Sequence, residues 1–185
     1  MNMSRNSVTR DMREAHASFF ERLSRLLRGR AVPAALAVRI SPRVADAFER
    51  GAAALDRGRL DAAEAAFEEA LAAADAPAQI AAVRNKRAIV AIRRVDRARA
   101  VDELILALEA DSRCAAAITT IGNLLLEDGA VADAIEHYEY ALLVDDAYAA
   151  AYHNLGVALH RSGRRGEAVR MLRKATRLES RMKRT

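Results

Sequence analysis

The stretch GRLDAAEAAFEEAL, residues 58–71, places one glycine ahead of a run of strong helix formers. Within that run Ala63, Phe67 and Ala70 follow the glycine at steps of five, four and three residues. Helix propensity explains the alanines and glutamates, but it does not require an aromatic residue between two small ones. The order is typical of helices that cross closely, with one large side chain filling the space between them.

The same pattern recurs along the chain, and the later copies begin 34 residues apart. Three further stretches align with the first without gaps: VDRARAVDELILAL (95–108), GAVADAIEHYEYAL (129–142) and GRRGEAVRMLRKAT (163–176). Seven residues before each of the four starts lies another small residue: Gly51, Ala88, Gly122 and Gly156. The spacing between the first two copies is three residues longer, and we expect the extra residues to form a longer turn around Pro77. The chain is therefore built from internal repeats.

The composition predicts an all-α protein. The 185 residues are 52% hydrophobic but only 4% aromatic, with 8 Gly and 3 Pro, so the core must consist of Ala, Leu and Val. A single cysteine fits a reducing compartment. No run of about 18 apolar residues occurs, and the first residues lack the apolar middle of a signal peptide. We expect a cytoplasmic protein, either free or peripheral to a membrane or a large assembly.

The repeat pattern resembles the tetratricopeptide repeat (TPR) family, whose 34-residue unit is a pair of antiparallel helices. The best match is AYHNLGVALHRSGRRGEAVRMLRKA, residues 151–175. The resemblance implies a right-handed α-solenoid of about four helix-turn-helix repeats, with a concave surface made by the first helix of each repeat. It assigns the segments as follows: an array over 44–180, divided into 44–80, 81–114, 115–148 and 149–180, and then a basic tail over 181–185.

Local signals agree with this organisation. Gly51 is expected to let the two helices of the first repeat approach closely, with Phe67 filling the wedge between them. Gly58 is expected to end the first helix in a left-handed turn, where a side chain would clash. Ser41 and Pro42 are expected to be the N-cap and the first helical residue of the array.

The second repeat departs from the pattern. Arg84 and Arg87 replace a large apolar residue and a leucine, and Val95 replaces the turn glycine. We therefore expect either an irregular first helix in this repeat or an arginine-rich face that is used for binding.

Residues 1–43 precede the array. Apolar residues recur at helical spacing over 8–28, so an amphipathic helix is predicted there, followed by a connecting segment over 31–43. Its opposite face is basic and carries Arg10, Arg13, Arg22, Arg25 and Arg28. Two roles stay open: the helix caps the array or covers its groove, or it contacts an anionic membrane or a partner.

The sequence offers little chemistry, and we predict a non-enzymatic protein without catalytic residues, metal or cofactor. The four histidines form no HExxH pair, and neither a phosphate-binding GxxxxGK[ST] loop nor a metal-binding cysteine motif occurs. His153 and His160 share a helix face but stand about 10 Å apart, too far to grip one ion.

The resemblance predicts a peptide ligand along the first helices, where asparagine amides of the family hold a peptide backbone. Asn123 and Asn154 occupy such positions, whereas Thr119 and Ala150 stand where a clamp for a C-terminal carboxylate would need basic residues. The predicted function is a protein-interaction scaffold or adaptor that binds a peptide or partner protein of some acidic character and organises an assembly. The predicted groove residues are Asn85, Ile89, Ile92, Arg93, Thr119, Asn123, Leu126, His153, Asn154, Val157, His160 and Arg161.

Charge is banded along the chain. Residues 115–160 contain no Lys or Arg, whereas residues 161–184 hold ten. The alternative prediction is thus an Arg-rich binder of nucleic acid or of an anionic membrane surface, although the basic segment lacks interleaved aromatic residues for stacking on bases. We also expect self-association through the C-terminal end, against the acidic band over 127–146 of another copy. The residues assigned to this contact are Arg170, Leu172, Arg173 and Arg177.

Overall fold

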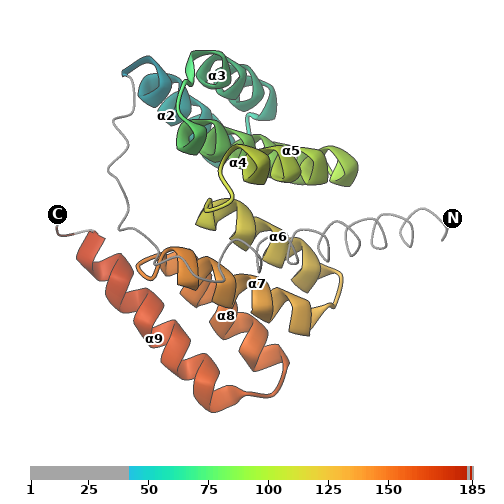
Figure 1. Cartoon of the computed structure of the whole chain (residues 1–185), viewed down its shortest axis with the longest axis vertical. Coiled ribbons are helices and arrows are strands. Elements are labelled where there is room, and N and C mark those ends of the chain that lie inside the picture. Colours follow the sequence, from blue (N-terminus) through green and yellow to red (C-terminus); the bar gives the residue numbers. More distant parts are fainter. Residues whose placement is uncertain (1–41, 183, 185) are drawn as a thin grey trace, which may run out of the picture. The chain divides into compact units, whose positions relative to one another are not determined.

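The computed structural model describes residues 42–182 and residue 184, and these residues form α-helices and no strand (Figure 1). The helices are α2 (Pro42–Asp56), α3 (Leu60–Ala73), α4 (Pro77–Arg93), α5 (Arg97–Ala110), α6 (Ala115–Glu127), α7 (Val131–Val144), α8 (Ala149–Arg161) and α9 (Arg165–Met182). The all-α prediction is confirmed, and α2 begins at Pro42 as expected. The helix predicted over 8–28, Ser41 and most of the connecting segment lie outside the described residues.

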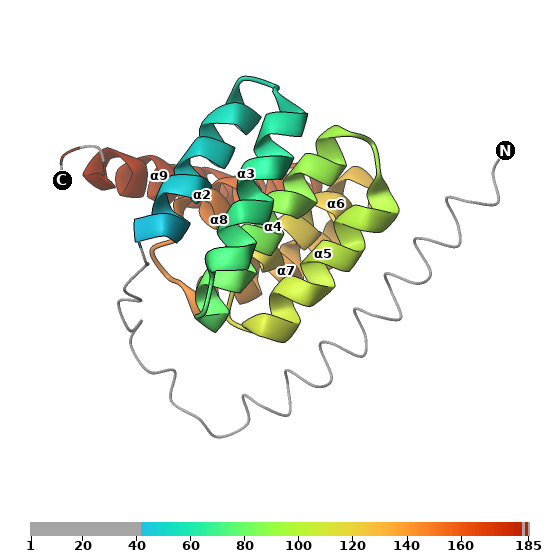
Figure 2. The same ribbon diagram turned by 90° about the horizontal axis from the view of Figure 1, so that it is seen from above.

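Consecutive helices pack as hairpins: α2 with α3, α4 with α5, α6 with α7 and α8 with α9. Successive hairpins stack through contacts of α3 with α4, α5 with α6 and α7 with α8. The first helices also contact one another, α2 with α4, α4 with α6 and α6 with α8 (Figure 2). The described residues are therefore an α-solenoid, and we call the surface formed by α4, α6 and α8 the first-helix row.

The recurrent small residues lie where the two helices of a hairpin cross. A Cβ atom added to the glycine at such a crossing would collide with the large residue of the second helix. This holds for Gly51 against Phe67 (2.5 Å), Gly122 against Tyr138 (2.6 Å) and Gly156 against Leu172 (2.7 Å). In the second hairpin Ala88 and Leu104 take these places, and both are buried. The expected close approach of the helices is confirmed, because these distances are shorter than any normal carbon contact.

Each hairpin turns through one residue in the left-handed conformation. Gly58, Gly129 and Gly163 have φ of 71°, 79° and 85°, which confirms the expectation for Gly58. Val95 takes the same place in the second hairpin with φ 62°, although its side chain is β-branched. Its turn is otherwise ordinary, since the Asp96 N–H donates to the Ala91 carbonyl as in the glycine turns.

The three extra residues of the first spacing were expected in a longer turn, and this expectation is wrong. α3 ends at Ala73 and α4 begins at Pro77, so the turn between them is short. The extra residues lengthen α4 instead, which has 17 residues where α6 and α8 have 13. Pro77 begins the helix because its fixed φ suits the first helical position, where a backbone N–H is not needed.

The arginines of the second repeat pair within the fold. α4 is a regular helix, so the expectation of an irregular one is wrong. Arg84 and Arg87 form ion pairs with the buried Glu103 of α5 at 3.0 and 3.1 Å. Arg87 also reaches Glu64 of α3 at 3.4 Å, and Arg99 of α5 pairs with the same carboxylate. This network joins three helices, and one repeat later the positions of Arg84 and Arg87 hold Ile118 and Ile121.

α9 is the longest of the described helices and continues to Met182, two residues beyond the expected end of the array at residue 180. Among the described helices it packs against α8. Lys174 of α9 lies over the Tyr152 ring of α8, 4.3 Å from its centroid. No helix within 42–182 combines the length and the apolar character that crossing a membrane needs.

Candidate binding surface

All twelve predicted groove residues belong to α4, α6 and α8. They occupy equivalent positions because the repeats are 34 residues apart, as Asn85, Thr119 and His153 illustrate. Since the three helices contact one another in turn, these equivalent positions lie along the first-helix row.

The row contains a chain of side-chain hydrogen bonds. The amide oxygen of Asn123 accepts two of them, one from the Tyr138 hydroxyl and one from the amide nitrogen of Asn154, both at 2.8 Å. Burial raises the pKa of Tyr138, so its phenol keeps the proton that it donates. These bonds connect α6, α7 and α8 and fix the orientation of both amides. We call Asn123 and Asn154 the amide pair.

The amide pair keeps hydrogen-bonding capacity after these bonds are made. The Asn123 nitrogen has two N–H groups, and the Asn154 oxygen has two lone pairs. Neither atom bonds to a described residue, and both side chains are half-buried. One donor on Asn123 and one acceptor on Asn154 are thus available, on amides that the two hydrogen bonds to the Asn123 oxygen orient.

The remaining predicted residues differ in how far their side chains are exposed to solvent. Arg93, His153, His160 and Arg161 are exposed, and Ile89, Ile92 and Val157 are half-buried. Arg161 donates to the Leu126 carbonyl at the end of α6 at 3.3 Å, a contact that orients its guanidinium across two helices. The exposed members are mostly basic and the half-buried ones apolar.

The structure buries three of the predicted residues, namely Asn85, Thr119 and Leu126. Asn85 accepts a 2.8 Å hydrogen bond from the Thr120 hydroxyl of α6, so its amide joins α4 to α6. Their register places them on the first-helix row, but the burial of each side chain depends on the residues packed around it, which the register does not specify. These three residues support the row and are too enclosed to form its open surface.

Two features of the site went unpredicted. Tyr138, which aligns with Phe67, fills the helix crossing as that alignment predicts, and its hydroxyl also orients Asn123. The ion-pair network of Glu64, Glu103 and three arginines was missed because its members come from different helices. The one available signal was the arginine at two core positions of α4, which requires nearby carboxylates.

Within residues 42–182 no three His, Cys, Asp or Glu side chains lie close enough together to hold a metal ion. His153 and His160, which the sequence places on one helix face, are both exposed in α8.

Family models identify the repeats. A model described as TPR repeat matches residues 122–163, and one described as Tetratricopeptide repeat matches residues 149–178. Residues 122–178 are therefore tetratricopeptide repeats. TPRs are protein-interaction modules, and in this general sense the chain is a protein-interaction scaffold. None of the curated proteins matches it by sequence.

Solved structures share the TPR fold. PilF of Pseudomonas aeruginosa is 24% identical over 74% of this chain and 61% of its own, with a TM-score of 0.61. MamA is 19% identical over 100% and 99%, with a TM-score of 0.54. YrrB, described as a TPR protein with an unusual peptide-binding site, is 21% identical over 74% and 69%, with a TM-score of 0.50. The chain thus spans about three fifths of the PilF structure, and at these identities the likeness concerns the fold alone.

Proposed function

We propose that the array is an adaptor that binds an extended segment of a partner protein along the first-helix row. The amide pair holds the peptide backbone, and the half-buried Ile89, Ile92 and Val157 contact apolar side chains of the peptide. The exposed arginines and histidines of the row favour acidic side chains. The setting proposed for this adaptor is the cytoplasm.

The amide pair is the observation that carries this proposal. A peptide unit presents one C=O acceptor and one N–H donor, and the pair presents a donor on Asn123 and an acceptor on Asn154. Both amides are already oriented by the bonds to Asn123, so a peptide does not have to order them on binding. Backbone recognition of this kind accepts many sequences, and the side chains around it supply selectivity.

Basic side chains on the first-helix row are the reason why we expect it to prefer an acidic peptide. The row carries Arg93, Arg161 and the two exposed histidines. At the position of α6 equivalent to the two arginines stands Glu127, which lies 3.8 Å from Arg97. A carboxylate of the peptide beside Arg161 would gain a charge-assisted hydrogen bond while Arg161 keeps its contact to α6.

The test uses peptides selected from a random displayed library on the immobilised wild-type protein. Asn123→Asp keeps an oxygen for Tyr138 and for Asn154 but removes the two N–H donors. Asn123→Asp combined with Asn154→Ala is expected to weaken binding of a selected peptide about tenfold or more, at roughly 0.5–1.5 kcal/mol per lost hydrogen bond. Fluorescence anisotropy measures this change.

The matched control is Glu68→Ala, a substitution at an exposed position of α3 away from the row. It is expected to leave the affinity unchanged. Asn123→Ala is a poorer variant because it leaves the buried Tyr138 hydroxyl without its acceptor and lowers stability as well. If the double variant binds the selected peptides as tightly as the wild type, the amide pair is not the binding site.

A further inference from the structure

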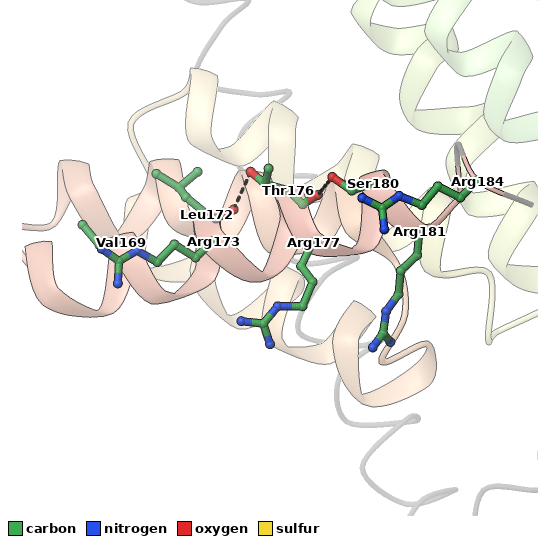
Figure 3. A pocket seen from close by; sticks show the side chains of 8 residues that line it. All are labelled: Val169, Leu172, Arg173, Thr176, Arg177, Ser180, Arg181 and Arg184. Carbon is green, nitrogen blue, oxygen red and sulfur yellow. Dashed lines mark hydrogen bonds between the residues drawn. The ribbon is translucent and has the colours of Figure 1, made fainter.

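The outer face of α9 is an open surface with two apolar residues toward the start of the helix and arginines along the rest of it (Figure 3). Val169 exposes 47% of its surface there, and the face borders a hollow of about 660 Å³ (Figure 3). The hydroxyls of Thr176 and Ser180 donate to carbonyls of their own helix, so they need no further partner. The residues that line this face are Val169, Leu172, Arg173, Thr176, Arg177, Ser180, Arg181 and Arg184.

One repeat earlier, the equivalent face receives a helix. Ile135 of α7 stands 34 residues before Val169 and is buried in one cluster with Leu155 and Ala158 of α8. Leu142, 34 residues before Thr176, packs against the same cluster. The α9 face therefore has the form that packs against a helix, but within the described residues no helix covers it.

The positive charge on this face of α9 favours an acidic partner. Arg173, Arg177 and Arg181 recur every four residues along one side of α9 and form no ion pair with a described residue. By contrast, Arg164 is bound by Glu167 at 2.7 Å. Figure 3 shows the guanidinium groups of Arg177 and Arg181 pointing the same way from the helix. An occupant with acidic residues at helical spacing would neutralise them.

The outer side of α7 has that pattern. Glu136, Glu139 and Leu143 are exposed and share one face of α7, and the exposed Asp146 follows in the next turn. Leu143 exposes 62% of its surface, so this acidic stripe also contains an exposed apolar residue. Residues 8–28 of the chain are a poor occupant because they carry five arginines on the polar side of their predicted helix.

We propose that the α9 face of one copy docks against the acidic α7 stripe of a second copy. In an antiparallel arrangement, Leu143 packs on Val169 and Leu172 while Glu139 and Glu136 lie beside Arg177 and Arg181. The two surfaces differ, so each bound copy keeps one of each free, and the contact extends into a chain or closes a ring. This assembly uses the second helices and leaves the first-helix row open for the peptide of the proposed function.

The test is light scattering coupled to gel filtration of the nuclease-treated full chain, at several protein concentrations and two salt concentrations. At low salt the mass of the wild type is expected to rise with concentration above the 20.2 kDa of one chain. High salt is expected to return it toward one chain, because exposed ion pairs are screened. A mass of one chain at every concentration would overturn the proposal.

Charge reversal tests the two surfaces separately. Arg177→Glu and Glu139→Arg each place like charges in the contact, so each variant alone is expected to stay monomeric. In an equimolar mixture the two intact surfaces oppose each other with opposite charges, and so do the two reversed surfaces, so the mixture is expected to assemble like the wild type. The double variant, which restores opposite charges, is expected to assemble like the wild type. Both positions are exposed, and circular dichroism checks the fold.

Three outcomes would overturn the contact even if the wild type assembles. Single variants that assemble as well as the wild type would exclude these surfaces. A mixture that stays monomeric would exclude the pairing of α9 with α7. Assembly that disappears on nuclease treatment would instead assign the basic face to nucleic acid.

Discussion

At the residue scale, Val95 holds a conformation that its side chain disfavours. The other three hairpins use glycine at this place, and Val95 has the same left-handed φ of 62° while exposing 89% of its surface. A left-handed conformation costs a residue with a Cβ about 1–2 kcal/mol, and Val95 gains little packing in return. The turn is kept because the surrounding helix ends impose it.

Val95→Gly is therefore expected to stabilise the protein by about 1 kcal/mol, after allowing for the greater freedom of glycine in the unfolded chain. Denaturant unfolding measures this change. Ala65→Gly, at an exposed position within α3, is the control and is expected to cost about 1 kcal/mol. Equal losses from both substitutions would show that Val95 is not strained.

At the scale of the helices, the crossing of α6 and α7 leaves no room for a side chain at Gly122. Tyr138 fills that space, and its ring cannot swing away without losing the hydroxyl bond to Asn123. Gly122→Leu is expected to lower the free energy of unfolding by about 1–3 kcal/mol through overpacking.

Ala147→Leu, in the exposed turn after α7, is the control for this substitution and is expected to change stability by less than about 0.5 kcal/mol. Thermal unfolding followed by circular dichroism compares the two variants. Similar effects of both would argue against the close crossing of α6 and α7.

At the scale of the whole molecule, the repeat register was enough to predict the hairpins, their crossings and the glycine turns. Each of these features depends on residues within one repeat, and four copies of the pattern reinforce one another. The register also placed Asn123 and Asn154 on the first-helix row, since equivalent positions of stacked repeats share a face. The predicted repeat boundaries and N-terminal helix stay predictions.

The ion pairs and the burial of individual side chains depend on contacts between repeats, and the sequence of a single repeat does not specify these contacts. Arg84 finds its carboxylate on α5, and Arg87 and Arg99 share one on α3, so their pairing could not be predicted before the three helices were packed. The depth of Thr119 likewise follows from the neighbouring side chains and not from its position in the repeat.

The central claim is that the amide pair binds the backbone of a peptide. The side-chain amide signals of Asn123 in an NMR titration with a selected peptide test it most directly, because its two N–H groups bond to no described residue in the free protein. Both signals are expected to shift, with the same Kd that anisotropy gives for the peptide. Signals of Asn123 that stay in place while the peptide saturates the protein would contradict it.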